Sequence, residues 1–121
     1  MMLAVAVLAN AGPLEDGLAA ADQGDFETAL RLWRPLAEQG NAKAQVYVGD
    51  IYNIGKGVPQ DYTDAAKWFH KAAEQGDVTA QSVLGNLYLL GDGVRQDDAE
   101  AVKWYRLAAK QGDAEAQVMP L

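Results

Sequence analysis

The residues of this chain whose types and spacing could support acid–base chemistry are His70 and Glu74, in the stretch WFHKAAEQG. Four positions apart on a helix, an imidazole and a carboxylate share one face and could exchange protons with a substrate. There is no cysteine and no second histidine, which excludes thiolate nucleophiles and multi-histidine metal sites. A copy of the stretch 36 residues later carries Arg106 and Lys110 at the matching positions. We therefore interpret His70 and Glu74 as a variable solvated face, and the sequence predicts no enzyme and no catalytic residue.

Two glycine-rich segments, GKGVPQD at 55–61 and GDGVRQDD at 91–98, could suggest phosphate or calcium binding. Neither has the G-x-x-x-x-G-K-[ST] spacing of a phosphate loop. Acidic residues accompany the second segment: Asp92, Asp97, Asp98 and Glu100. They do not follow the D-x-[DN]-x-[DN]-G order of a calcium loop, and the helix dipole favours acidic side chains at a helix start. Both segments are predicted to be turns between helices, with no cofactor and no metal.

The elements that would position these residues are set by an internal repeat. When residues 41–76 are compared with 77–112, sixteen of 36 positions carry the same residue. The shared positions include a tryptophan at 68 and 104 and an Ala-Ala pair at 72–73 and 108–109. A third, weaker copy of the motif occupies 32–45. A fixed period of this length is typical of a solenoid, in which each copy forms one layer.

Each copy is predicted to form two antiparallel helices. The first helices are expected at about 41–54 and 77–90, after N-caps Asn41 and Asp77 and before left-handed glycines. The second are expected at about 61–75 and 97–111, after Asp61 and Asp97. Gly49 and Gly85 fall inside the first helices, where glycine costs roughly 1 kcal/mol relative to alanine. That cost predicts a close approach of a neighbouring backbone or aromatic ring.

The stretch AQSVLGNLYLLGDGVRQDDAEAVKWYRLAAKQGDAEAQ at 80–117 resembles the Sel-one-like repeat, a relative of the tetratricopeptide repeat. The resemblance covers about residues 41–117, with Val48 at the position of a family leucine. It implies an all-α, tetratricopeptide-like superhelix of antiparallel helix hairpins. We expect about three hairpins and a short C-terminal helix.

The predicted organisation has five parts. Residues 1–11 are an apolar stretch, 12–40 a tetratricopeptide-like cap hairpin, 41–76 and 77–112 two full repeats, and 113–121 a partial repeat or capping helix. The cap lacks the G-x-G-V-x-x-D loop and has Pro35 inside its second helix, where a kink is expected.

The first eleven residues, MMLAVAVLANA, have the apolar run and small-x-small ending of an export signal, without a preceding Lys or Arg. We interpret them as a truncated signal peptide; the alternative is an apolar N-terminal helix. An exported chain would begin near Gly12 and be periplasmic or secreted. Otherwise it is expected in the cytoplasm.

The resemblance also implies a partner-binding groove on the concave face, formed by the first helix of each hairpin. By analogy of helix position, ten residues are predicted to line it: Lys43, Val46, Asp50, Asn53, Ile54, Thr79, Ser82, Asn86, Leu89 and Leu90. The polar members could bind a peptide backbone. The apolar members could contact a partner, or could simply complete the core.

The predicted function is therefore a non-enzymatic adaptor or scaffold that binds a protein or peptide. The formal net charge of −7 argues against nucleic acid, and the mature chain is not expected to insert into a membrane. Two alternatives remain: an exported immunity or inhibitor protein for a secreted enzyme, and a structural protein that self-associates. In the second alternative a homodimer would form through the C-terminal end.

Overall fold

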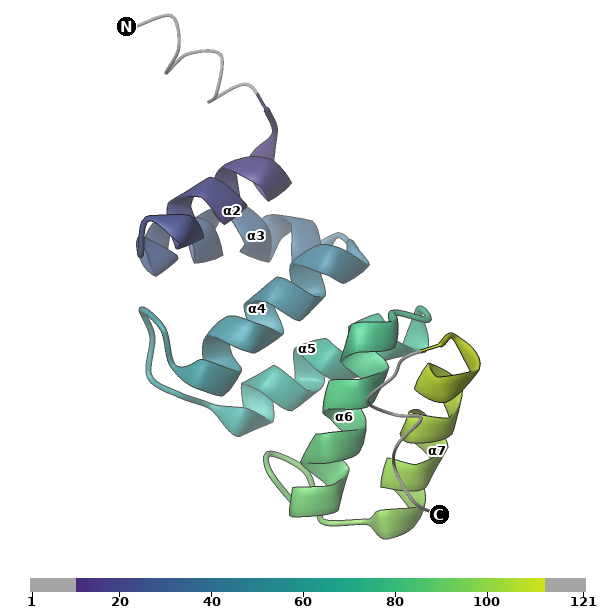
Figure 1. The fold of residues 1–121 in the computed structure, drawn as a ribbon. Coiled ribbons are helices and arrows are strands. Elements are labelled where there is room, and N and C mark those ends of the chain that lie inside the picture. The colour runs from purple at the N-terminus through teal and green to yellow at the C-terminus, as the bar shows by residue number, and fades with distance from the viewer. Residues whose placement is uncertain (1–10, 113–121) are drawn as a thin grey trace, which may run out of the picture.

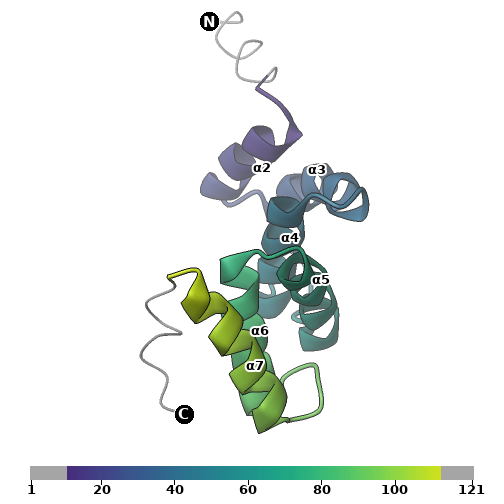
Figure 2. The same cartoon turned by 90° about the vertical axis from the view of Figure 1, so that its right-hand side faces the viewer.

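The computed structural model describes residues 11–112, which form six α-helices and no β-strand. The helices are α2 (Pro13–Asp22), α3 (Phe26–Glu38), α4 (Ala42–Ile54), α5 (Tyr62–Glu74), α6 (Val78–Leu90) and α7 (Asp98–Lys110). Each packs against the next along the chain, so hairpins α2–α3, α4–α5 and α6–α7 follow one another as layers (Figures 1 and 2). The predicted solenoid of helix hairpins is confirmed. The expected C-terminal helix and most of the apolar stretch lie outside the described residues.

Polar caps define the helix boundaries in the two full repeats. The side chains of Asn41 and Asp77 accept hydrogen bonds of 2.9 Å from the amides of Ala44 and Ala80, as N-cap residues do. Asp61 and Asp97 cap α5 and α7 in the same way. Helix α3 continues through Pro35 to Glu38. None of the described helices is long and apolar enough to cross a bilayer.

The glycines inside the first helices lie against aromatic rings of their own hairpin. A Cβ atom at Gly49 would stand 3.0 Å from the ring of Phe69, and one at Gly85 would stand 2.9 Å from the ring of Tyr105. The close approach predicted from sequence is thus confirmed and involves rings. Gly17 lies against the ring of Trp33 in the same way, so the first hairpin has the same glycine–aromatic packing.

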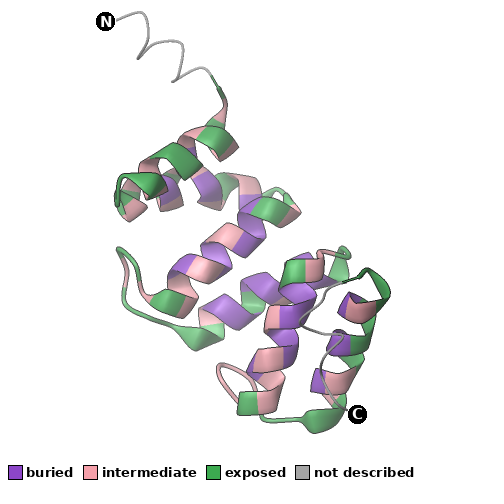
Figure 3. Ribbon diagram, in the orientation of Figure 1, coloured by how far each residue is buried: buried purple, intermediate pink, exposed green. Residues whose placement is uncertain are grey.

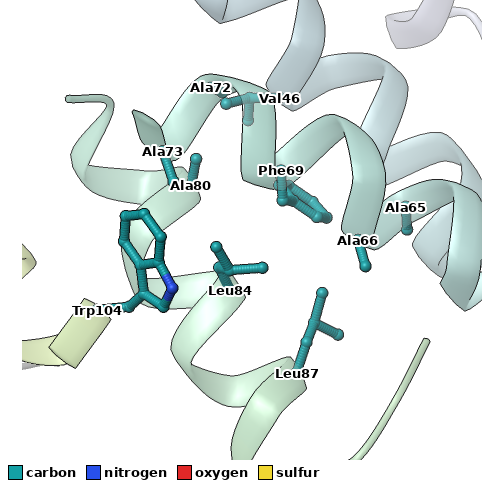
Figure 4. Close-up of a cluster of buried hydrophobic side chains, with 10 residues drawn as sticks. All are labelled: Val46, Ala65, Ala66, Phe69, Ala72, Ala73, Ala80, Leu84, Leu87 and Trp104. Atoms are coloured by element: carbon teal, nitrogen blue, oxygen red, sulfur yellow. The ribbon is translucent and has the colours of Figure 1, made fainter. Parts of the chain in front are cut away.

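Most buried residues (Figure 3) form two clusters between the layers, and a third cluster lies within the hairpin α6–α7. Trp68 packs in a cluster with α3 and α4, and Trp104 packs in the next cluster with residues of α5 and α6. Figure 4 shows the indole of Trp104 beside Leu84, while Phe69 points into the same cluster from α5. Each repeated tryptophan therefore contributes to the contact between its own hairpin and the preceding one.

Repeated glutamines connect the same layers by hydrogen bonds. The Nε2 group of Gln45 donates to the carbonyl of Ala37, and Nε2 of Gln75 donates to the carbonyl of Gly40 and to Oε1 of Gln45. One layer further on, Gln81 and Gln111 make the equivalent bonds to Ala73, to Gly76 and to each other. These glutamine pairs fix the register of one hairpin on the next.

Candidate functional site

His70 and Glu74 form an exposed pair on α5. The Nδ1 atom of His70 lies 3.4 Å from Oε2 of Glu74, a contact that becomes an ion pair only when the imidazole is protonated. Their side chains are 38% and 62% exposed, so water surrounds both groups. The imidazole also meets the ring of Trp104 edge-on, with centroids 5.6 Å apart. The geometry agrees with the interpretation of this pair as a solvated face.

The hollow beside this pair, of about 390 Å³, is a weak candidate for a site. It is lined by Thr63, Ala66, Lys67, His70, Lys71, Gly93 and Val94. The ammonium of Lys67 lies 3.5 Å from the carboxylate of Asp64, and that of Lys71 lies over the ring of Trp68. The charge of Lys67 is thus paired and the ammonium of Lys71 is held over a ring, so neither cation is directed at a ligand in the hollow.

The glycine-rich segments are inter-helix loops that pack on the preceding hairpin. A Cβ atom at Gly57 would stand 2.9 Å from Cβ of Phe26, and one at Gly93 would stand 2.0 Å from the carbonyl oxygen of Tyr62. The second glycine of each loop therefore permits close contact between layers.

The acidic residues of the second loop take part in local interactions. Asp97 accepts hydrogen bonds from the amides of Ala99 and Glu100, and Asp98 accepts one from Gln96. Within residues 11–112 no three metal-binding side chains cluster.

The ten predicted groove residues lie on α4 and α6 and differ in exposure. The exposed ones are Lys43, Ile54, Thr79 and Leu90. The half-buried ones are Asp50, Asn53, Asn86 and Leu89. The buried ones are Val46 and Ser82, at 6% and 5% exposure.

Burial corrects the prediction for two of these residues. Val46 belongs to the core cluster that contains Phe69 and Leu84, and Ser82 is enclosed at the equivalent position of α6. At 6% and 5% exposure, neither side chain offers surface to a partner in this structure. Ile54 and Leu90, by contrast, are 58% and 68% exposed, so they do not complete the core.

A pocket of about 120 Å³ lies between the α2–α3 hairpin and α4. Its apolar walls are formed by Ala21, Phe26, Trp33, Tyr47, Ile51 and Ile54. The rings of Trp33 and Tyr47 are in contact, with centroids 4.7 Å apart. Two charged groups complete the lining, the carboxylate of Asp50 and the ammonium of Lys56. The structure thus joins two predicted groove residues, Asp50 and Ile54, in one concave site.

The carboxylate of Asp50 is in an unfavourable environment for its charge. Burial, and secondarily the negative charge of Asp77, raise its pKa from 3.8 to about 6. Within residues 11–112 it has neither a hydrogen-bond donor nor an ion-pair partner. A desolvated carboxylate in an apolar pocket favours a ligand that brings a hydrogen-bond donor or a positive charge.

Sequence reasoning missed most of this pocket. Phe26 and Trp33 lie on α3, and Lys56 lies on the loop after α4. The predicted groove includes only residues of the first helices, α4 and α6. A signal was present in the repeat itself. Asp50 stands where the next copy has Asn86, and Phe69 stands where it has Tyr105. These two differences between the copies lie at positions that form a hydrogen bond in α6–α7.

Comparison with known proteins agrees with the fold. The family model of the Sel1 repeat matches residues 6–41, 42–77 and 78–113. A Sel1 repeat protein from Oxalobacter formigenes is 38% identical, with a TM-score of 0.82 over 86% of this chain and 43% of that one. The protein c5321, a protective antigen present in uropathogenic Escherichia coli strains that displays an SLR fold, is 33% identical, with a TM-score of 0.83 over 86% of this chain and 23% of that one.

Cysteine rich protein B of Helicobacter pylori shares the fold at 24% identity, with a TM-score of 0.76 over 84% of this chain and 77% of that one. No curated protein matches the chain. The chain spans less than half the length of the first two solved structures, c5321 and the Oxalobacter protein. The three matched repeats run without a gap from residue 6 to residue 113, and the chain therefore belongs to the Sel1 repeat family.

Proposed function

We propose that the chain is a protein-interaction module that binds an extended segment of a partner across the exposed faces of α4 and α6. Sel1 repeats are typically scaffolds for protein interactions, which supports this class of function. The observation that carries the proposal is the pocket beside Asp50, because it combines aromatic walls with a carboxylate that has no hydrogen-bond donor in the described part of the chain. Its small volume suits one side chain of a peptide better than a larger free ligand.

The proposed contact surface extends from this pocket along two parallel sets of residues. Lys43, Asp50 and Ile54 share one face of α4, and Thr79, Asn86 and Leu90 occupy the equivalent face of α6. Polar groups on these faces would bind the peptide backbone, and Ile54 and Leu90 would contact its apolar side chains. The role is that of an adaptor without catalytic chemistry of its own.

The cellular location of this function depends on the N-terminal stretch. If residues 1–11 act as an export signal, the module works in the periplasm or outside the cell. The family match begins at residue 6, so part of this stretch is also assigned to the first repeat. N-terminal sequencing of the protein purified from the cell envelope and from the cytoplasm shows whether these residues are cleaved as a signal or retained as part of the first repeat.

Photo-crosslinking in cells tests the proposed face. The probe, benzoylphenylalanine, replaces Ile54 in one full-length variant and the exposed Arg106 of α7 in a matched control. We expect one protein adduct from position 54, lost when Asp50→Arg is added, and a different pattern from position 106. Identical adducts from both positions, or none, would overturn the proposal. An adduct with a second copy of the chain would instead support the self-association alternative.

A further inference from the structure

The pocket beside Asp50 has an internal counterpart that shows what it lacks. In the hairpin α6–α7 the hydroxyl of Tyr105 donates a hydrogen bond to Oδ1 of Asn86. The equivalent residues of the hairpin α4–α5 are Asp50 and Phe69. Phe69 is fully buried against Gly49 but has no hydroxyl to donate. The hairpin α6–α7 thus has a neutral acceptor, Asn86, that is bonded internally. The hairpin α4–α5 has an ionisable acceptor, Asp50, and no hydroxyl at the equivalent of Tyr105.

The walls of the same pocket are suited to a positive charge. The face of an aromatic ring attracts cations, and Phe26, Trp33 and Tyr47 line the pocket. One cation of the chain already uses this property, since Nζ of Lys56 lies 5.9 Å from the ring centroid of Phe26. The side chain of Lys56 is exposed and comes from the loop after α4, so it can move aside for a ligand.

We propose that this pocket binds the cationic side chain of a lysine or arginine in the partner peptide, with Asp50 as its counter-ion and the aromatic rings as its walls. This inference rests on the proposed function and adds the chemical class of the anchoring residue. The electrostatic environment supports it, because Asp77 adds negative charge near the site and the chain as a whole carries −7. An acidic peptide would be repelled by the same charges.

Lys56 is an internal competitor in this arrangement. Its ammonium occupies one aromatic face that a ligand cation would use, so its removal should improve access. Lys71 provides a matched control, because its Nζ lies 5.1 Å from the ring centroid of Trp68, outside the pocket.

The test begins with a random dodecapeptide library displayed on phage and selected on the full-length protein. Selected peptides are synthesised with each lysine replaced by norleucine, or each arginine by citrulline, and affinities are measured by fluorescence anisotropy. We expect one position at which the neutral replacement weakens binding about tenfold. Asp50→Asn should cost a similar factor, and the two changes together should cost little more than either alone. Asn is already carried at the equivalent position 86, so this variant is compatible with the fold.

The lysine variants give a second, opposite readout. Lys56→Ala should strengthen binding of the cationic peptide about two- to threefold, and Lys71→Ala should leave it unchanged. Peptides that bind through Asp50 and Ile54 but tolerate norleucine or citrulline everywhere would overturn the inference and leave the proposed function standing. If no peptide binds better than a scrambled control, or if Asp50→Arg and Asn86→Arg have no effect, both fail.

Discussion

A Cβ atom built on Gly93 would lie 2.0 Å from the backbone carbonyl oxygen of Tyr62, although the two residues belong to different hairpins. The loop before α7 thus rests directly on the backbone at the start of α5. Gly93 also has a φ of 75°, a conformation that side chains disfavour. The contact explains why both full repeats have a second glycine in this loop.

Gly93→Ala should therefore be strongly destabilising. We expect a loss of about 3 kcal/mol in the free energy of unfolding, from the combined clash and backbone strain. Gly76→Ala is the control, because Gly76 has a φ of 94° but no atom within 4 Å of the position that a Cβ atom would take. It should lose only about 1 kcal/mol. Urea denaturation of both variants measures the difference, and equal losses would show that the interlayer contact is unimportant.

Phe69→Tyr should restore the missing donor of the Asp50 pocket. In α7 the Tyr105 hydroxyl reaches Asn86, so a hydroxyl on residue 69 is expected to reach the carboxylate of Asp50. A hydrogen bond to the charged form lowers a carboxyl pKa, and the pKa of Asp50 should fall below its value of about 6. Carbon-detected NMR titration of the Asp50 carboxyl measures it directly. An unchanged pKa would mean that a hydroxyl on residue 69 does not reach the carboxylate of Asp50, although Tyr105 reaches Asn86.

The stability of the protein should depend on the ionisation of Asp50. Burial raises the folded-state pKa of Asp50 from 3.8 to about 6, so protonation favours the folded state. This contribution is fully present below about pH 4, is lost as pH rises through about 6, and stays lost above it. Asp50→Asn should consequently become more stable than the parent by about 1 to 2 kcal/mol at pH 7, a value reduced for solvent screening, and by little at pH 4. Thermal denaturation at both pH values tests the sign, which would be reversed if Asp50 had a hidden cationic partner.

The same ionisation should control peptide binding if the anchor is cationic. The charged or titratable groups around the carboxylate are Lys56 and Tyr47 in the pocket and Asp77 at the start of α6. With a pKa of about 6, roughly a tenth of Asp50 is ionised at pH 5 and roughly nine-tenths at pH 7. Because neutral Asp50 should bind about tenfold more weakly, as in Asp50→Asn, a cationic peptide should bind about fivefold more weakly at pH 5 than at pH 7, as measured by fluorescence anisotropy. Asp50→Asn should show no such dependence, and a dependence that persisted in this variant would contradict the role of Asp50 as counter-ion.

Asn53→Leu should stabilise the fold. The Oδ1 atom of Asn53 is buried and has no hydrogen-bond partner among residues 11–112, and the equivalent position of the next repeat carries Leu89. Removing an unsatisfied buried acceptor should raise the free energy of unfolding, measured by urea denaturation, by about 1 kcal/mol. The reverse change at the equivalent position, Leu89→Asn, serves as the control and should lose stability. A destabilised Asn53→Leu variant would show that a water or partner satisfies this group.

The helices of the two full repeats were predictable because their boundaries depend on local chemistry. Asn41, Asp61, Asp77 and Asp97 cap helices through their own side chains, and Gly55 and Gly91 end helices in the left-handed conformation. The buried positions of Val46 and Ser82 were not predictable from the analogy, because a small rotation of a helix exchanges groove and core positions. The pocket was not predictable from helix positions either, since it needs the rings of Phe26 and Trp33 from another hairpin.

The glutamine pairs have a consequence for how such a chain can change in length. Gln81 bonds to Ala73 as Gln45 bonds to Ala37, and Gln111 bonds to Gly76 as Gln75 bonds to Gly40. Every donor therefore finds its acceptor at a fixed offset, whichever layer it belongs to. A duplication of residues 41–76 in tandem would recreate each of these bonds, whereas an insertion of one residue fewer would misalign the bonds that span the new junction. Insertions and deletions in this fold should accordingly comprise whole repeats, because only these keep the hydrogen bonds between layers in register.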